Sequence, residues 1–477
     1  MIPSSRTSVG YARRGRAWSR SPHRHGRRLT RAIALALPAL LASCNRSAAP
    51  AASSDAAASQ AESPSAETID PAKLPNILLY VADTLRADSV GCYGDDIVET
   101  PVIDRLAAEG VLYETAIAQT SWTRTSIASI LSATYPDVHA AQGRHDLLAE
   151  EVLLLPEVLK RYGYATACVT TNPNVGSFFG FDQGYDDFVE LYGRKEAGFV
   201  ATRELITKSD VVTDQAIEWL QNVEQPFFLF VLTIDPHAPY DPPERFDRYL
   251  PAVKKTDWAR DKPLPQVRKR AKYLGEIASN DFQFGRLLDD LRQRGMFERT
   301  ITVFTSDHGE EFWEHGRNGH GHYLFDESIR VPLIVRYPRE LPMGIRIPQT
   351  VELIDVAPTL LRLAGLPPLD KVDGEPLPIR SNHESDAWAF SSLSLRERFM
   401  TSWRAEPWKL IWNHTDDSQQ LFNLDDDPGE LQDVSRRYEK RFADLVAATT
   451  ALREDCLKRR ALLHRDGEPQ RTSDAQT

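Results

Sequence analysis

Three apolar runs in this chain of 477 residues each end in side chains that can carry chemistry. They are residues 75–82, 226–233 and 301–304, followed by Asp83, His237 and the pair Asp307-His308. Continuous apolar runs of this kind are typical of parallel strands that are covered on both faces. Helical patterns fill most of the sequence between them. The alternation predicts an α/β fold, with a mostly parallel central sheet and helices on both of its faces.

A second pattern begins near residue 386, where short strands follow one another without intervening helices. One long helix is predicted after them, at residues 438–464. We therefore expect a main domain at residues 74–385 and a smaller C-terminal α+β subdomain at residues 386–477. A chain of this length accommodates one large and one small folded unit.

The first 43 residues resemble a bacterial lipoprotein signal peptide. Nine arginines precede an apolar run at residues 32–42, which is too short to span a bilayer. The run ends in LASC, a lipobox in which Cys44 is lipidated after cleavage. A plain cleaved signal or a misplaced start codon stays open as an alternative. An Ala/Ser/Pro-rich tether at residues 44–73 follows, so we expect a lipid-anchored protein of the bacterial cell envelope, on the periplasmic or outer-membrane side.

Charge and cysteine content limit the possible partners. Without the nine arginines of the signal, the net charge of −11 becomes −20, which argues against nucleic acid as a partner. An anionic substrate then requires a local cationic site. The four cysteines do not form a disulfide framework, and with Cys44 lipidated they allow at most one bridge.

The carboxyl ends of parallel strands meet at one edge of a sheet, where ligands bind in open α/β folds. Asp83, Asp307 and His308 are therefore expected to lie together and to suit a divalent cation. His315, His320 and His322 follow within fourteen residues of His308, so a His-rich surface loop is the alternative explanation. A hydroxyl-rich helix start near Thr123 would offer free N–H groups to an anion, although the local sequence favours ordinary N-capping.

Several motifs, in order, resemble the sulfatase family of the alkaline phosphatase superfamily. The matching stretches between Pro75 and Glu430 are NILL (76–79) with DTLRAD (83–88), GCYG (91–94), TPVIDRLAAEG (100–110), residues 121–136, DPHAPY (235–240), TSDHGEE (305–311), GHGHY (319–323), RVP (330–332) and LFNLDDDPGE (421–430).

The resemblance implies a site, residue by residue. One divalent cation, Ca²⁺, Mg²⁺ or Mn²⁺, would be bound by Asp83, Thr84, Thr123, Asp307 and His308, with Thr84 where the family usually has a second Asp. Thr123 takes the place of the Cys that relatives convert to formylglycine, so no formylglycine is expected. The arginine of the family motif falls on Ile127, and Arg124 is the candidate to replace it in binding substrate.

The resemblance also implies a chemistry. Superfamily relatives such as lipoteichoic acid synthase and phosphoethanolamine transferases use a Thr nucleophile, so Thr123 is expected to attack sulfur or phosphorus. His237 and His322, and also His320, would bind ester oxygens or protonate the leaving oxygen. Glu310, Glu311 and Glu314 are expected on a solvated helical face.

Three functions follow from this pattern. The first is a metal-dependent hydrolase of sulfate, phosphate or phosphonate esters, acting on an anionic ester such as a sulfated glycan or a small molecule. The second is a transferase that moves a phospho-substituent onto an envelope glycan or lipid. The third is a non-catalytic binding lipoprotein that retained the fold.

Overall fold

The computed structural model describes residues 69–192, 207–380 and 387–463. The expected signal peptide, its lipidated Cys44 and most of the tether lie outside these ranges. Within them, no helix has both the length and the apolarity needed to cross a bilayer. Cys92, Cys168 and Cys456 are free thiols, so the one bridge that the sequence allowed is not formed among them.

The central sheet has eight strands in the order β10-β2-β9-β6-β1-β5-β3-β4. Every neighbouring pair is parallel except the two made by β9, which runs antiparallel to β2 and β6. The strands are β1 Asn76–Ala82, β2 Val111–Ile117, β3 Ala165–Thr170, β4 Asp187–Glu190, β5 Phe227–Thr233, β6 Thr300–Thr305, β9 Arg330–Arg336 and β10 Ile345–Glu352. The predicted mostly parallel sheet is confirmed.

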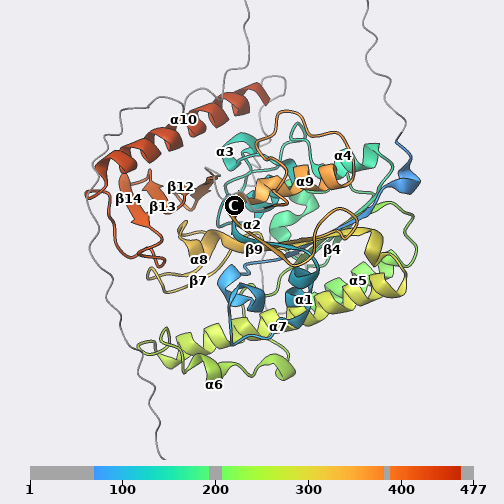
Figure 1. Ribbon diagram of the computed structural model, residues 1–477, viewed down its shortest axis with the longest axis horizontal. Helices are drawn as coiled ribbons and strands as arrows, with labels where there is room; N and C mark the ends of the chain where they lie inside the picture. The colour runs from blue at the N-terminus through green and yellow to red at the C-terminus, as the bar shows by residue number, and fades with distance from the viewer. Residues whose placement is uncertain (1–68, 193–206, 381–386, 464–477) are drawn as a thin grey trace, which may run out of the picture. The chain divides into compact units, whose positions relative to one another are not determined.

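Helices cover both faces of this sheet (Figure 1). One face carries α1 Pro101–Glu109, α5 Ser209–Leu220 and α7 Leu264–Gln293; the other carries α2 Thr123–Ser132, α4 Leu155–Arg161 and α9 Val356–Leu363. Successive β1 side chains alternate between the two cores: Leu78 and Tyr80 pack with the α7 side, whereas Ile77 and Leu79 pack with the α2 side. Because both faces are buried, β1 has to be apolar throughout, as its sequence is.

The C-terminal subdomain is a separate four-stranded antiparallel sheet, in the order β11-β12-β13-β14. Its strands are Ala389–Leu395, Arg398–Ala405, Trp408–Asn413 and Ser418–Asn423, and the helix α10, Glu439–Leu463, packs on it (Figure 1). The predicted α+β subdomain is thus confirmed. Strand β11 is joined to the main domain just before α2, because Ser392 donates its backbone N–H to the carbonyl of Gln119 at 2.8 Å.

Four short elements complete the connections near the sheet edge. They are α3 Pro136–His139, α8 Asp326–Ile329 and the two-stranded ribbon of β7 Glu311–Phe312 and β8 Asn318–Gly319, while α6 Leu250–Val253 lies in the excursion before α7.

Candidate active site

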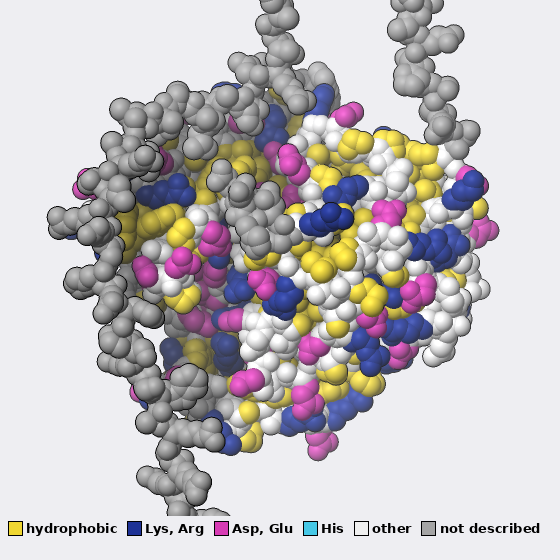
Figure 2. Space-filling model, in the orientation of Figure 1, with side chains coloured by type: hydrophobic (Ala, Val, Ile, Leu, Met, Phe, Trp, Pro, Cys, Tyr) yellow, Lys and Arg dark blue, Asp and Glu magenta, His cyan; other side chains and the backbone are white. Residues whose placement is uncertain are grey.

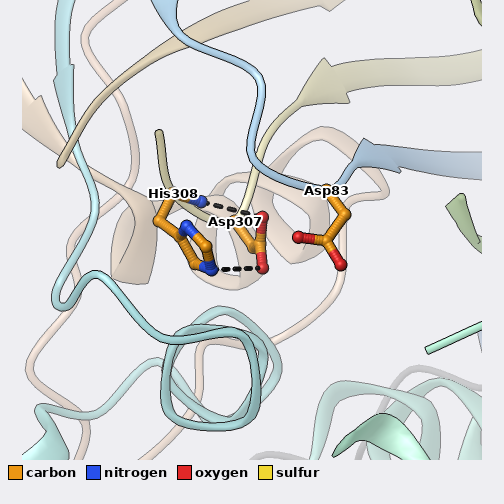
Figure 3. A group of neighbouring side chains, drawn as sticks. All are labelled: Asp83, Asp307 and His308. Carbon is orange, nitrogen blue, oxygen red and sulfur yellow. Dashed lines mark hydrogen bonds and ion pairs between the residues drawn. The ribbon is translucent and has the colours of Figure 1, made fainter. Parts of the chain in front are cut away.

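The three predicted cation ligands meet at the carboxyl edge of the sheet (Figure 3). Strands β1 and β6 are parallel neighbours with Val81 opposite Thr305, so Asp83 and Asp307 emerge side by side. One ligand atom from each of Asp83, Asp307 and His308 lies within 4.8 Å of the other two, and all three side chains are fully buried.

Each carboxylate is held by one oxygen and presents the other to the site. Asn172 donates its side-chain N–H to Asp83 Oδ2 at 2.5 Å, and the backbone N–H groups of Thr84 and His308 donate to Asp307 Oδ1 at 3.1 and 2.9 Å. In the part of the chain that the structure describes, Asp83 Oδ1 and Asp307 Oδ2 are buried without a hydrogen-bond partner, and Asp307 Oδ2 lies 3.3 Å from His308 Nε2 (Figure 3).

These paired carboxylates fit a cation. Burial and the nearby Asp307 raise the pKa of Asp83 well above its ordinary value. Two buried carboxylates side by side are costly unless a positive charge neutralises them. Two carboxylate oxygens and the His308 ring nitrogen form a donor set that suits one divalent ion.

Thr84 lies next to this cluster, with its backbone in the left-handed region at φ 62°. Its backbone is engaged on both sides, because Tyr273 donates its hydroxyl to the Thr84 carbonyl at 2.8 Å and the Thr84 N–H bonds Asp307. The Oγ1 atom is buried and has no hydrogen-bond partner among the described residues. A ligand role for Thr84 stays a prediction.

Thr123 is the first residue of α2 and faces the same cluster. Its Oγ1 lies 3.2 Å from Nε2 of His308, and its side chain is buried. Ser126, one turn later, donates its hydroxyl to the backbone carbonyl of Asp307 at 2.6 Å, which ties α2 to the end of β6. The helix start also directs its positive dipole end toward the site. The Thr123 hydroxyl therefore lies beside the three predicted cation ligands.

Two of the three predicted histidines lie close to the cluster. The ring centroid of His320 is 4.7 Å from that of His308 and 4.9 Å from that of His237. Burial lowers the pKa of His237 to about 4 and lowers that of His320 well below its ordinary value. Both rings are therefore neutral at pH 7 and can hold or exchange one proton. His322 lies further out, half-buried, with its ring 3.5 Å from the guanidinium of Arg396.

Glu310 is a residue that the sequence argument misplaced. It is fully buried, not solvated, and its Oε1 lies 3.0 Å from Nδ1 of His320, so it fixes the orientation of that ring. Glu311 is also buried, on strand β7, and Glu314 forms an ion pair with Arg86 at 2.6 Å. The expected solvated helical face is wrong, because this segment folds back as a small ribbon beneath the site.

The expectation for Arg124 is also wrong. Its guanidinium is buried over the Phe179 ring at 3.3 Å and donates to the carbonyl of Arg144 at 2.7 Å. Further bonds run to carbonyls of Gly143 and Asp146 and to Asn174. Because its donors hold the loop that follows α3, Arg124 is not available to replace the missing motif arginine.

Comparisons with known proteins agree with this fold. A family model described as Sulfatase matches residues 75–366, and one described as N-sulphoglucosamine sulphohydrolase, C-terminal, matches residues 314–455. The chain belongs to the sulfatase family, a family of sulfuric ester hydrolases within the alkaline phosphatase superfamily.

Curated relatives and solved structures extend the comparison. The chain is 28% identical to an arylsulfatase of Clostridium perfringens, with 77% of this chain and 92% of the relative covered. It is 23% identical to an N-acetylglucosamine-6-O-sulfatase of Bacteroides thetaiotaomicron, with 78% and 85% covered. A protein solved with its substrate D-glucosamine-2-N,6-O-disulfate is similar in fold, with a TM-score of 0.69, 21% identity, and 84% and 100% of the chains covered. So is the phosphonate monoester hydrolase of Agrobacterium radiobacter, with a TM-score of 0.67, 22% identity, and 82% and 96% covered.

Proposed function

We propose that this protein hydrolyses a sulfate ester with the Thr123 hydroxyl as its nucleophile. The observation that carries the proposal is the position of Thr123 Oγ1, buried at the start of α2 and 3.2 Å from His308 Nε2. A threonine that served only as a helix cap would not need to lie beside the buried carboxylates of Asp83 and Asp307.

Asp83, Asp307 and His308 would hold one divalent cation. When bound, such a cation lowers the pKa of a neighbouring hydroxyl and offsets negative charge on the transferred group. The orphaned oxygens of Asp83 and Asp307 support this part of the proposal. Threonine cannot form formylglycine, so the proposal needs none.

The residues then divide the chemistry between them. The Thr123 proton passes to the neutral ring of His320 or His237 as Oγ bonds to sulfur, while the bond from sulfur to the ester oxygen breaks. His320 or His237 gives a proton to the departing oxygen, and Glu310 keeps the His320 ring in place for this transfer. Water then cleaves the sulfo-threonine, which releases sulfate and restores the hydroxyl.

A sulfated sugar is the proposed substrate. One relative is an N-acetylglucosamine-6-O-sulfatase, and one structural neighbour was solved with a disulfated glucosamine as its substrate. The lipoprotein-like N-terminus supports a place in the bacterial envelope, anchored by lipid at Cys44.

The test is hydrolysis of a panel comprising an aryl sulfate, a phosphate monoester, a phosphate diester and a phosphonate ester, with and without chelator. Turnover of the sulfate that chelator and Thr123→Ala both abolish would support the proposal. Thr125→Ala is the matched control, because it removes a hydroxyl from the same helix that bonds only the carbonyls of Ala141 and Gln142. Preference for a phosphorus ester would move the assignment to that ester class. Failure on all four esters, with no metal bound, would instead favour the binding lipoprotein.

A further inference from the structure

The tip of the β11–β12 hairpin is built from two charged residues in an unusual backbone conformation. Leu395 pairs with Arg398, so Arg396 and Glu397 form the two-residue turn between them. Both have positive φ, at 53° and 61°. Turns of this kind favour Asn and Gly, and strained side-chain-bearing residues persist where the surrounding structure or a function requires them.

This tip packs against the catalytic domain beside the site. A Cβ on Gly321 would lie 2.8 Å from Leu395 Cδ2, so the absence of a side chain between His320 and His322 allows the close approach. Arg398 donates to the carbonyl of His322 at 3.3 Å. The guanidinium of Arg396 lies 5.9 Å from the Trp122 ring centroid, and Trp122 directly precedes Thr123.

Positive charge gathers at this point. Burial and the charges of Arg396, Arg398 and Arg317 lower the pKa of His322. Burial and the charges of Arg144 and Arg398 lower the pKa of Arg396. None of these four arginines forms a salt bridge with a carboxylate among the described residues. The carboxylates that act on them are Glu310 and Glu311, both buried, and the exposed Asp416, which bonds Ser418.

The cluster differs from the face of the molecule that Figure 2 draws. On the face drawn in Figure 2, basic and acidic side chains are interspersed. The buried Arg336, by contrast, has a carboxylate partner in Glu298 at 2.9 Å. Like charges held together without ion-pair partners repel one another, and a bound anion reduces that cost.

We propose that Arg396 and Arg398, with His322, bind a second anionic group of the substrate, next to the ester that Thr123 attacks. The inference rests on the proposed function. It narrows the substrate class to sugars that carry at least two anionic groups, such as a second sulfate or a carboxylate.

A cavity beside Arg398 gives room for such a ligand. Its volume is about 390 Å³, and Arg398 forms part of its wall together with Tyr323, Asn413, Ser418 and Gln420. An aromatic ring beside amide and hydroxyl groups is a suitable lining for a sugar. Arg398, which bonds the His322 carbonyl, places this cavity next to the cationic cluster, and the acidic Asp416 also belongs to its wall.

The experiment compares ligand pairs that differ by one anionic group. Affinities of the full-length protein for glucosamine 6-O-sulfate and for glucosamine 2-N,6-O-disulfate are measured by calorimetry, alongside a sugar sulfate with and without a carboxylate. We expect the doubly anionic ligand of at least one pair to bind about tenfold more tightly, as one additional charge-assisted contact provides. The pair that shows the preference identifies the second anion.

Variants test where the preference arises. Arg396→Gln combined with Arg398→Gln should remove it, while Arg396→Lys should retain part of it. Arg437→Gln is the control, since it removes one exposed charge from the same subdomain beside Tyr438 and should leave the preference unchanged.

Each result has a definite meaning. Equal affinity within every pair, or an unchanged preference in the double variant, overturns the inference. Because calorimetry needs no turnover, a preference that disappears in the double variant supports the inference even if the aryl sulfate is not hydrolysed. A lack of hydrolysis would count only against the proposal that Thr123 is the nucleophile.

Discussion

His139 should make the protein lose stability in mild acid. This side chain ends α3, which packs between α2 and α10, and it is 1% exposed. The Ala141 N–H donates to its Nδ1 at 3.2 Å, so the ring proton lies on Nε2 and is donated to Ser129 Oγ at 3.0 Å. A second proton on Nδ1 would displace the Ala141 bond. Burial, and secondarily the charge of Arg460, lower the pKa of His139 to about 3.

The size of the effect follows from that shift. The unfolded chain binds a proton at His139 below about pH 6.5, whereas the folded chain remains neutral until about pH 3. Stability from this residue is therefore complete above pH 6.5 and falls as the pH drops toward 3. Between pH 7 and pH 5 the loss is about 2 kcal/mol, at about 1.4 kcal/mol for each pH unit below 6.5.

Urea unfolding of the protein and of His139→Gln, each at pH 7 and pH 5, isolates this contribution. The glutamine amide can still reach Ser129 but does not titrate. Other buried histidines, such as His237, act equally in both proteins and cancel in the comparison. The wild type should therefore lose about 2 kcal/mol more than the variant between the two pH values. Parallel pH profiles would refute the reasoning and show that His139 titrates normally in the folded state.

Three further changes have clear expected outcomes. Gly309→Ala should lower the free energy of unfolding by about 2 kcal/mol and reduce metal content, because a Cβ at this neighbour of His308 would lie 2.1 Å from the Glu327 carbonyl oxygen. Urea unfolding and elemental analysis check the two effects, and normal metal content would contradict the argument. Thr84→Asp should bind the cation at least tenfold more tightly, as calorimetry with Mn²⁺ can show, since it adds a carboxylate and Asp tolerates a φ of 62° better than Thr. Lys409→Met should lower the free energy of unfolding by about 3 kcal/mol, because Lys409 lies buried 2.7 Å from both Asp326 and Glu430; a loss below about 1 kcal/mol in urea unfolding would be inconsistent with a buried ion pair of this kind.

The sequence predicted those parts of the site that depend on strand ends. Asp83 follows an apolar run directly and Asp307-His308 follow one after two polar residues, and parallel pairing of neighbouring strands is enough to bring them together. These inferences needed only local pattern and the rule that parallel strands share a carboxyl edge. Thr123 was placed in the site by the resemblance to the sulfatase family, because its local sequence favours ordinary N-capping.

Other contacts depend on the path of the chain between elements, which no local pattern encodes. Asn172 follows β3, which is separated from β1 by β5, yet its loop returns to bond Asp83. Glu310 stands in an acidic stretch that reads as a solvated helix, and only the fold of β7 and β8 buries it. Arg396 belongs to the subdomain and reaches His322 across 74 residues of sequence. Of Asn172, Glu310 and Arg396, only Asn172 had a sequence signal, because it follows an apolar strand.

The departures from the family pattern are physically consistent with one another. A divalent cation between Asp83 and Asp307 would have its charge balanced by two carboxylates, and the neutral Thr84 adds no third. Fewer negative ligands leave a cation better able to stabilise an ionised hydroxyl, which a threonine nucleophile requires. The Asn172 amide holds Asp83 by a neutral N–H donor at 2.5 Å, so the carboxylate is oriented without being neutralised. Under the proposed function, Thr84, Asn172 and Thr123 would together suit a hydroxyl nucleophile, because each keeps the site low in negative charge.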